Sequence, residues 1–192
     1  MTININTIKK ASEELLGNIV RTPTIRSQYL SNEINSDVFL KLENLQHTSS
    51  FKVRGAYISI KRLKKEQKEM GVIAMSAGNH AQAVAWWAQK ENVNATIVMP
   101  EHAPLSKVMK TKSLGAEVIL KGRTLNESQT YVSELVKNKK LTLIHPYDDP
   151  NVVVGQGTLG LEIMEDIKNL DLLVIPIGGG GLISGISIVA KA

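Results

Sequence analysis

The sequence predicts an α/β fold with two doubly wound parallel-sheet domains, the larger of which is incomplete at its C-terminus. Short apolar runs alternate with amphipathic helical windows along the chain, as expected when helices cover both faces of parallel strands. Prolines and glycines interrupt the pattern at the ends of several runs. The apolar, helix-like segment 182–192 would normally lead to another buried strand in an open α/β sheet. We therefore expect the N-terminal portion, or a shortened relative, of a longer protein.

The predicted elements follow one another in strand-then-helix order. A helix over 7–16 and a turn or extended segment at 21–23 come first. Strands are expected over 38–42, 72–75, 95–99, 117–120, 141–144 and 172–177, and helices over 51–65, 79–90, a segment leading towards 114, 126–137 and 158–167. The strands near residues 40 and 175 would share one sheet. We expect a large domain from 1–48 and 146–192, and a small domain from 49–145.

Composition excludes several classes of protein. The 192 residues carry 23 Lys and Arg against 18 Asp and Glu, a net charge of +5, and few aromatic residues accompany the basic run at 61–68, so nucleic-acid binding is not indicated. The absence of cysteine excludes disulfides and thiolate metal sites, and the four histidines show no metal-binding spacing. No signal peptide or apolar stretch of membrane-spanning length is visible. These features predict a cytoplasmic protein with no metal, membrane or nucleic-acid partner.

Two glycine-rich stretches could approach a ligand. The run 178–181 follows an apolar segment and precedes a helical one, where backbone N–H groups and the helix dipole can hold an anion. A flexible turn is the alternative, and the glycines alone allow either a nucleotide phosphate or a cofactor phosphate. The stretch 155–160 matches the dinucleotide pattern G-x-G-x-x-G, but no acidic residue stands about 20 residues further on. We interpret it as a tight helix start beside a ligand rather than an NAD site.

Two polar stretches carry candidate reactive groups. Lys52 stands where a polar loop becomes a helical pattern, and a desolvated lysine amine can act in covalent catalysis, although most lysines remain solvated. The match of 49–52 to S-x-x-K is rejected because S-D-N and K-T-G are absent. The stretch 76–82, Ser-Ala-Gly-Asn-His-Ala-Gln, lies between a predicted strand and helix, and its N–H groups could hold a carboxylate. A helix cap with a structural His80 is the alternative.

Three motifs occur in one order: 42–46 leading to Ser-Phe-Lys-Val-Arg-Gly-Ala at 50–56, then 76–82, then Gly-Gly-Gly-Gly-Leu at 178–182. Together they resemble the pyridoxal-phosphate enzymes of the tryptophan-synthase-β fold type, in the threonine/serine dehydratase and serine racemase branch. The resemblance runs from about Ile8 to the last residue. It implies that the large domain binds pyridoxal 5'-phosphate, that an amino acid is the substrate, and that the protein is a homo-oligomer.

The resemblance also implies roles for individual residues. Lys52 would bond covalently to the cofactor and act as the catalytic base, Phe51 would pack beside the pyridine ring, and Asn79 would hydrogen-bond the cofactor's 3-hydroxyl group. The phosphate would be held by Gly178, Gly179, Gly180, Gly181 and Leu182. The substrate carboxylate would be bound by Ser76, Ala77, Gly78, Asn79 and His80.

The implied reaction is α,β-elimination, which converts L-threonine to 2-oxobutanoate, or L-serine to pyruvate, with release of ammonia. Ala77 favours a dehydratase over a racemase, because serine racemases typically carry a serine there that can reprotonate the opposite face. A serine racemase-like enzyme and an inactive remnant acting as a binding or assembly partner remain alternatives. A non-pyridoxal phosphate-binding module would leave Lys52 and Asn79 without a role. We further expect Ile183, Ile186 and Val189 to be exposed.

Overall fold

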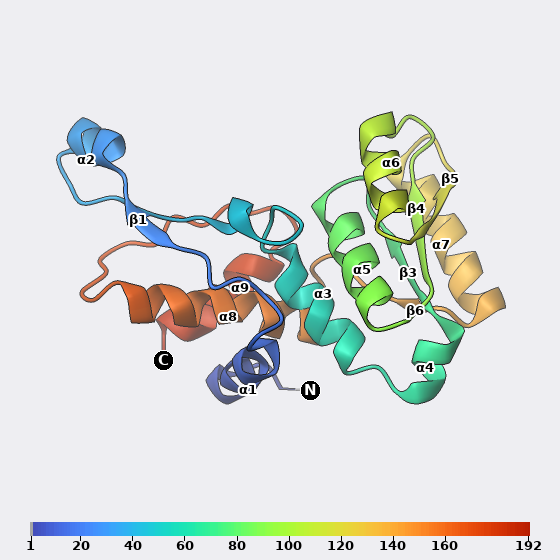
Figure 1. Cartoon of the computed structure of the whole chain (residues 1–192), viewed down its shortest axis with the longest axis horizontal. Coiled ribbons are helices and arrows are strands. Elements are labelled where there is room, and N and C mark those ends of the chain that lie inside the picture. The colour runs from blue at the N-terminus through green and yellow to red at the C-terminus, as the bar shows by residue number, and fades with distance from the viewer. Residues whose placement is uncertain (1) are drawn as a thin grey trace.

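The computed structural model describes residues 2–192, and Figure 1 shows helices gathered around α8 on one side and a sheet with its own helices on the other. The helical group consists of α1 (Ile5–Leu15), α3 (Lys52–Lys61), α8 (Pro150–Asp166) and α9 (Gly181–Ala190). The sheet region consists of α4 (Lys65–Met70), β3 (Val72–Met75), α5 (Asn79–Lys90), β4 (Ala95–Met99), α6 (Leu105–Ser113), β5 (Glu117–Leu120), α7 (Leu125–Lys139) and β6 (Thr142–Leu143). The remaining elements are β1 (Thr24–Arg26), α2 (Gln28–Ile34), β2 (Phe39–Lys41) and the short 3-10 helix η1 (Glu43–Leu45).

The sheet has the strand order β5-β4-β3-β6, and all neighbouring strands are parallel. Its two faces are covered by different helices, because successive side chains of a strand point to opposite faces. Ile73 and Val98 pack in a cluster with Val132 of α7, whereas Ala74 and Ile97 pack on the side of α5. This part of the chain is the doubly wound parallel sheet that the sequence predicts.

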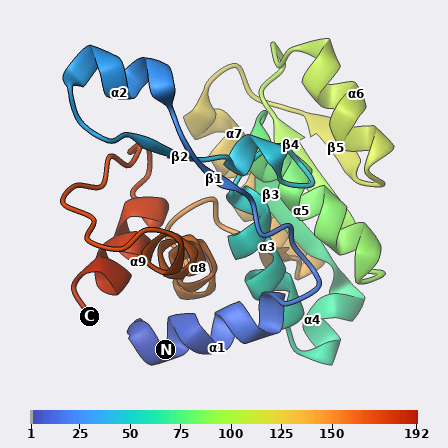
Figure 2. The same cartoon turned by 60° about the vertical axis from the view of Figure 1, so that its left-hand side comes forward.

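The helix α8 is the centre of the helical group, and α1, α3 and α9 pack against it (Figure 2). A methyl group at Gly155 would lie 2.6 Å from the Cα atom of Gly55 in α3, and one at Gly185 of α9 would lie 2.5 Å from the carbonyl oxygen of Val153. Such distances are closer than van der Waals contact allows. Glycine is therefore required here so that three helix backbones can approach one another.

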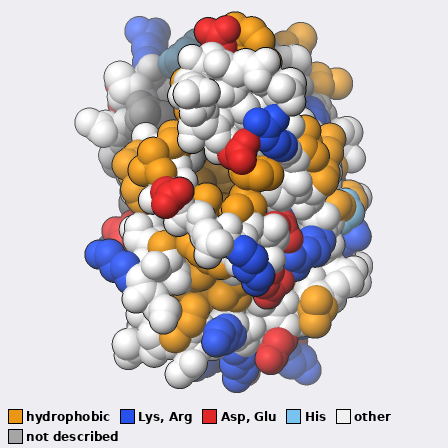
Figure 3. Space-filling view, turned by 90° about the vertical axis from the view of Figure 1, so that its left-hand side faces the viewer, with side chains coloured by type: hydrophobic (Ala, Val, Ile, Leu, Met, Phe, Trp, Pro, Cys, Tyr) orange, Lys and Arg blue, Asp and Glu red, His pale blue; other side chains and the backbone are white. Residues whose placement is uncertain are grey.

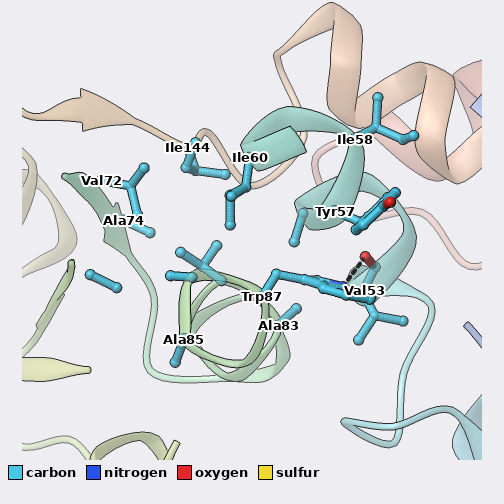
Figure 4. Close-up of a cluster of buried hydrophobic side chains, with 14 of the residues drawn as sticks. Val53, Tyr57, Ile58, Ile60, Val72, Ala74, Ala83, Ala85, Trp87 and Ile144 are labelled. Carbon is cyan, nitrogen blue, oxygen red and sulfur yellow. Dashed lines mark hydrogen bonds between the residues drawn. The ribbon is translucent and has the colours of Figure 1, made fainter. Parts of the chain in front are cut away.

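The helix α3 also packs against α5, so it lies between the helical group and the sheet (Figure 4). The rings of Tyr57 and Trp87 have centroids 4.5 Å apart, and Trp87 Nε1 donates a hydrogen bond of 2.9 Å to the carbonyl oxygen of Val53. A buried indole N–H needs such an acceptor. The main hydrophobic core is thus continuous from α1 through α3 to the sheet.

The helix α8 begins at Pro150, earlier than the start at 158 predicted from the sequence. Asp149 caps it by accepting hydrogen bonds from the backbone N–H groups of Asn151 and Val152, and proline suits the first turn of a helix. The stretch 155–160 therefore lies inside a helix, and its prediction as a tight helix start beside a ligand is wrong.

Two further predictions about the C-terminal region are wrong. Ile186 and Val189 are buried against α8 rather than exposed, because the glycines of α8 and α9 bring the two helices into close contact. Residues 172–177 form no strand ladder within the described part of the chain, and β2 pairs there only with β1, in an antiparallel ribbon. A strand ladder requires a hydrogen-bonded neighbour, which this segment lacks among residues 2–192. None of the helices in that range is long and apolar enough to cross a membrane.

Candidate active site

The topology of the parallel sheet indicates where a ligand can bind. The chain runs from β3 to β4 and β5 on one side, then returns through α7 to β6 on the other side of β3. The strand order reverses between β3 and β6, and ligands bind in open α/β sheets at the carboxyl ends of strands beside such a point. The loops that leave these two strand ends are 76–78 and 144–149.

Lys52 is the first residue of α3, and its amine reaches this point. Its Nζ atom donates a hydrogen bond of 2.6 Å to the carbonyl oxygen of Pro146 and lies 5.3 Å from the centroid of the Phe51 ring. Burial lowers the pKa of the Lys52 amine, since an ammonium group is less stable away from water. The amine is therefore more readily deprotonated than that of an exposed lysine.

The loop after β3 leads directly into α5. The Gly78 N–H donates a 3.1 Å hydrogen bond to Ser76 Oγ, and Ala77 between them is half-buried. Asn79 is the first residue of α5, where its side chain is exposed and has no hydrogen-bond partner within residues 2–192. Its amide is thus free to bind a ligand above the strand end.

His80 is buried behind this loop, and its Nε2 atom lies 2.8 Å from the carbonyl oxygen of Ile144. Burial lowers the pKa of His80 to about 4, the nearby Lys52 ammonium acts in the same direction, and the hydrogen bond to Ile144 opposes them only in part. The ring is therefore neutral at neutral pH, with the Nε2–H group as donor and Nδ1 as a buried acceptor that has no partner within the described residues. His80 fixes the start of α5 to the end of β6.

The glycine loop precedes α9 and lies against Tyr147. Gly178 and Gly180 have open space where a side chain would stand, and Gly180 has a φ of +88°, which favours glycine. A methyl group at Gly179 would collide with the ring of Tyr147, and one at Gly181 would lie 2.8 Å from the Tyr147 carbonyl oxygen. Leu182 is buried in a cluster against which Phe51 also packs. The first and third motifs of the sequence are thereby brought together.

The segment 144–147 connects all three motifs and was not predicted from the sequence. Ile144 contacts His80 of the second motif, Pro146 accepts the hydrogen bond of Lys52 from the first, and Tyr147 packs against the glycine loop of the third. The segment has no motif of its own. Its position after the strand that flanks β3 is the signal that could have identified it.

Buried ion pairs hold the first turn of α3, two residues beyond Lys52. The guanidinium group of Arg54 is fully buried and pairs with Glu43 of η1 at 2.9 Å and with Glu162 of α8 at 2.6 Å. Burial by itself would raise the pKa of Glu162, but the hydrogen bonds and charges of Arg54 and Lys41 lower it below its ordinary value. The Glu162 carboxylate therefore stays ionised, and α3 is fixed to α8 close to the lysine.

The described residues do not form a group of three or more metal-ligating side chains. They do offer a desolvated amine and a glycine loop with exposed space. The buried polar atoms without partners within residues 2–192 include Thr48 Oγ1, Ser50 Oγ and His80 Nδ1. An aldehyde cofactor that carries a phosphate and several polar substituents fits this set of groups.

Comparison with known proteins identifies the class to which this site belongs. Residues 15–192 match the family described as pyridoxal-phosphate dependent enzyme, and the chain belongs to that family. The relatives include the catabolic L-threonine dehydratase of Staphylococcus aureus, which is 52% identical over 191 residues. That alignment covers 99% of this chain but 55% of the relative, so the chain spans about half the length of the curated relatives it matches.

Solved structures with the same fold include both dehydratases and racemases. The serine racemase of Dictyostelium discoideum superposes with a TM-score of 0.93 at 37% identity, over 100% of this chain and 62% of that protein. A threonine deaminase of Solanum lycopersicum superposes with a TM-score of 0.90 at 38% identity, over 98% of this chain and 53% of that protein. The arrangement of the backbone therefore does not separate the two activities.

Proposed function

We propose that this chain forms the lysine-bearing part of a pyridoxal-phosphate dependent L-threonine (or L-serine) dehydratase. The reaction is an α,β-elimination that gives 2-oxobutanoate or pyruvate together with ammonia. The observation that carries the proposal is the position of the Lys52 amine, which is desolvated and hydrogen-bonded to the segment 144–147 beside the switch point of the sheet. The same segment contacts α5 and the glycine loop, which are the proposed binding elements for carboxylate and phosphate.

In this proposal the chain's own residues bind the substrate, orient the cofactor and move a proton. The backbone N–H groups of 76–80, at the start of the 12-residue helix α5, hold the substrate carboxylate. Lys52 Nζ removes the proton from Cα, which its lowered pKa favours because a neutral amine is the base. Asn79 orients the cofactor through its 3-hydroxyl, Phe51 packs beside its ring, and the N–H groups of 178–182 bind its phosphate. When bound, pyridoxal phosphate supplies an electron sink for the electrons left at Cα.

Two features favour a dehydratase over a racemase. Ala77 has no side-chain proton to deliver to the opposite face of the substrate, and the Staphylococcus aureus threonine dehydratase is more similar in sequence than the serine racemase structure, at 52% against 37% identity. A racemase-like activity is the second candidate because the serine racemase backbone superposes equally well. An inactive remnant that acts as a binding partner is the third.

Titration of the purified chain with pyridoxal phosphate tests the proposal. We expect a visible absorption band from lysine-bound cofactor, lost in Lys52→Ala and retained in Lys65→Ala, which removes an exposed lysine of α4. Release of 2-oxobutanoate from L-threonine, or of pyruvate from L-serine, then measures elimination. Formation of D-serine would favour the racemase, and absence of the band would contradict the proposal and favour the remnant.

A further inference from the structure

Two histidine rings hold the segment 144–147, which contacts all three motifs of the site. On the face of the molecule in Figure 3, histidine occupies only small areas near the edge, and hydrophobic side chains surround a hollow in the middle. His80 of α5 is buried, with 3% of the residue exposed, and His145 of the segment is half-buried. Both rings bond to backbone atoms at this segment, so they influence where its carbonyl groups point.

His80 binds the first residue of the segment. Ile144 is buried, and its N–H group donates a hydrogen bond of 2.9 Å to the carbonyl oxygen of Ile73 in β3. The carbonyl oxygen of Ile144 lies 2.8 Å from His80 Nε2. A buried carbonyl group needs a donor, and a neutral imidazole supplies one here when its proton is on Nε2. Ile144 is therefore fixed on two sides, to β3 and to α5.

The next residues of the segment have little freedom to move independently of Ile144. His145 Nδ1 accepts a hydrogen bond of 2.8 Å from the backbone N–H group of Asp148, which closes the turn. The ring of Pro146 restricts its own φ angle. The carbonyl oxygen of Pro146 then accepts the 2.6 Å hydrogen bond of Lys52 Nζ. A displacement of Ile144 would therefore also displace the acceptor of the lysine amine.

We propose that His80 is a positioning residue for the Lys52 amine and that it acts through the segment 144–147. Its ring donates to the Ile144 carbonyl group, two residues before the Pro146 carbonyl group that holds the amine. His80 needs no contact with a ligand for this role. The use of the amine in cofactor binding rests on the proposed function, whereas the coupling between His80 and Lys52 is a property of the chain alone.

A double-mutant cycle on the chain without cofactor tests this coupling. His80→Leu keeps a similar volume but removes the donor to Ile144, and Lys52→Ala removes the donor to Pro146. Because both bonds hold one segment, their combined effect on the unfolding equilibrium constant in urea should fall short of the product of the single effects by at least about threefold. His80→Leu combined with Lys65→Ala, at an exposed lysine, should give the simple product.

Two further variants separate action through the segment from other causes. His80→Gln offers an amide N–H to Ile144 and should restore most of the coupling to Lys52. In a Pro146→Gly background, the more flexible segment should reduce the coupling of His80 and Lys52 to less than about twofold. Simple products in both cycles would overturn the proposal, as would a coupling that Pro146→Gly leaves unchanged.

The absorption band of lysine-bound pyridoxal phosphate gives a second measurement. It should form at least about tenfold more slowly in His80→Leu, because the amine is no longer held in place, and His80→Gln should recover most of the rate. Pro146→Gly, which leaves His80 intact, should also slow the band and keeps the proposal testable if His80→Leu does not fold. Val108→Ala, a buried substitution on α6, should lower stability without changing the rate.

The outcomes for His80 and for the proposed function are distinguishable. Equal rates of band formation in the wild type, His80→Leu and Pro146→Gly would overturn the positioning role while leaving the cofactor assignment intact. If the wild-type chain forms no band, the proposed function fails, and the double-mutant cycle alone then decides whether His80 positions Lys52.

Discussion

Replacing His80 with glutamine should make the free energy of unfolding less sensitive to acid. His80 is buried, its pKa is lowered from 6.5 to about 4, and its Nε2–H group donates to the carbonyl oxygen of Ile144. A glutamine side chain can present an amide N–H at a similar place but does not titrate. The variant therefore removes the ionisation of this side chain while offering a replacement donor.

The expected magnitude follows from the difference in pKa. In the unfolded chain the imidazole binds a proton near pH 6.5, whereas in the folded protein it does so only near pH 4. Between these values the unfolded state holds more protons, so acid favours unfolding. The stabilisation from the neutral ring is fully present above about pH 6.5 and is lost as the pH falls towards 4. A shift of this size corresponds to about 3 kcal/mol, of which about 2.5 kcal/mol is lost by about pH 4.5.

Urea unfolding at about pH 7 and about pH 4.5 measures the effect. The wild-type chain should lose about 2 to 3 kcal/mol more than His80→Gln between the two conditions, after subtraction of the effects common to both. His102→Gln, at an exposed histidine, should behave like the wild type. Equal losses in the wild type and His80→Gln would refute the inference that His80 is held neutral by burial.

Three further substitutions test the packing and ion pairs described above. Gly155→Ala should lower the free energy of unfolding in chemical denaturation by about 2 to 4 kcal/mol, because the added methyl group would overlap the backbone of α3. Gly160→Ala, where the nearest contact of the added methyl group is 3.1 Å away, should cost clearly less. Similar losses in the two variants would contradict the close-packing argument. Arg54→Met should cost about 3 to 5 kcal/mol, since it leaves the buried Glu43 without its cationic partner and Glu162 with Lys41 alone. Arg21→Met removes exposed pairs worth less than about 1 kcal/mol. An Arg54→Met variant as stable as Arg21→Met would exclude a structural role for the buried network. Asp149→Ala should lower the unfolding free energy by about 1 kcal/mol through loss of the cap on α8, and no change would show that Pro150 alone sets the start of that helix.

Several features of the fold and candidate site follow from local sequence patterns. The strands β3, β4 and β5 and the helix α5 are predicted almost to the residue, because each is a short apolar run or an amphipathic window next to glycine or proline. Lys52 and the loop before Asn79 could also be predicted from local patterns, because each lies at a predicted junction between a loop and a helix. The spacing of apolar residues and the positions of glycine and proline are sufficient to predict these elements.

The features that were missed depend on distant parts of the chain. The helix α8 was predicted too short because its glycines indicate a loop when considered alone, yet they lie at contacts with α3 and α9. Ile186 and Val189 are buried for the same reason. The segment 144–147 has an unremarkable sequence, and its place in the site arises from the return of β6 to the side of β3. These contacts depend on how distant segments of the chain come together, which local sequence patterns do not show.

The pairing of Arg54 with Glu162 has a consequence for the order in which the chain folds. Glu43 stands only 11 positions from Arg54 and can pair with it early, but Glu162 is 108 positions away, so Arg54 lacks its second carboxylate partner until α8 has been synthesised. Until then, burial of α3 would place the guanidinium group in an apolar environment with part of its hydrogen-bonding capacity unused, which is unfavourable. The parallel sheet, whose strands lie between these residues in sequence, can form earlier from more local contacts. During synthesis the sheet should therefore precede the helical group, and Lys52 should reach its place only in the final step.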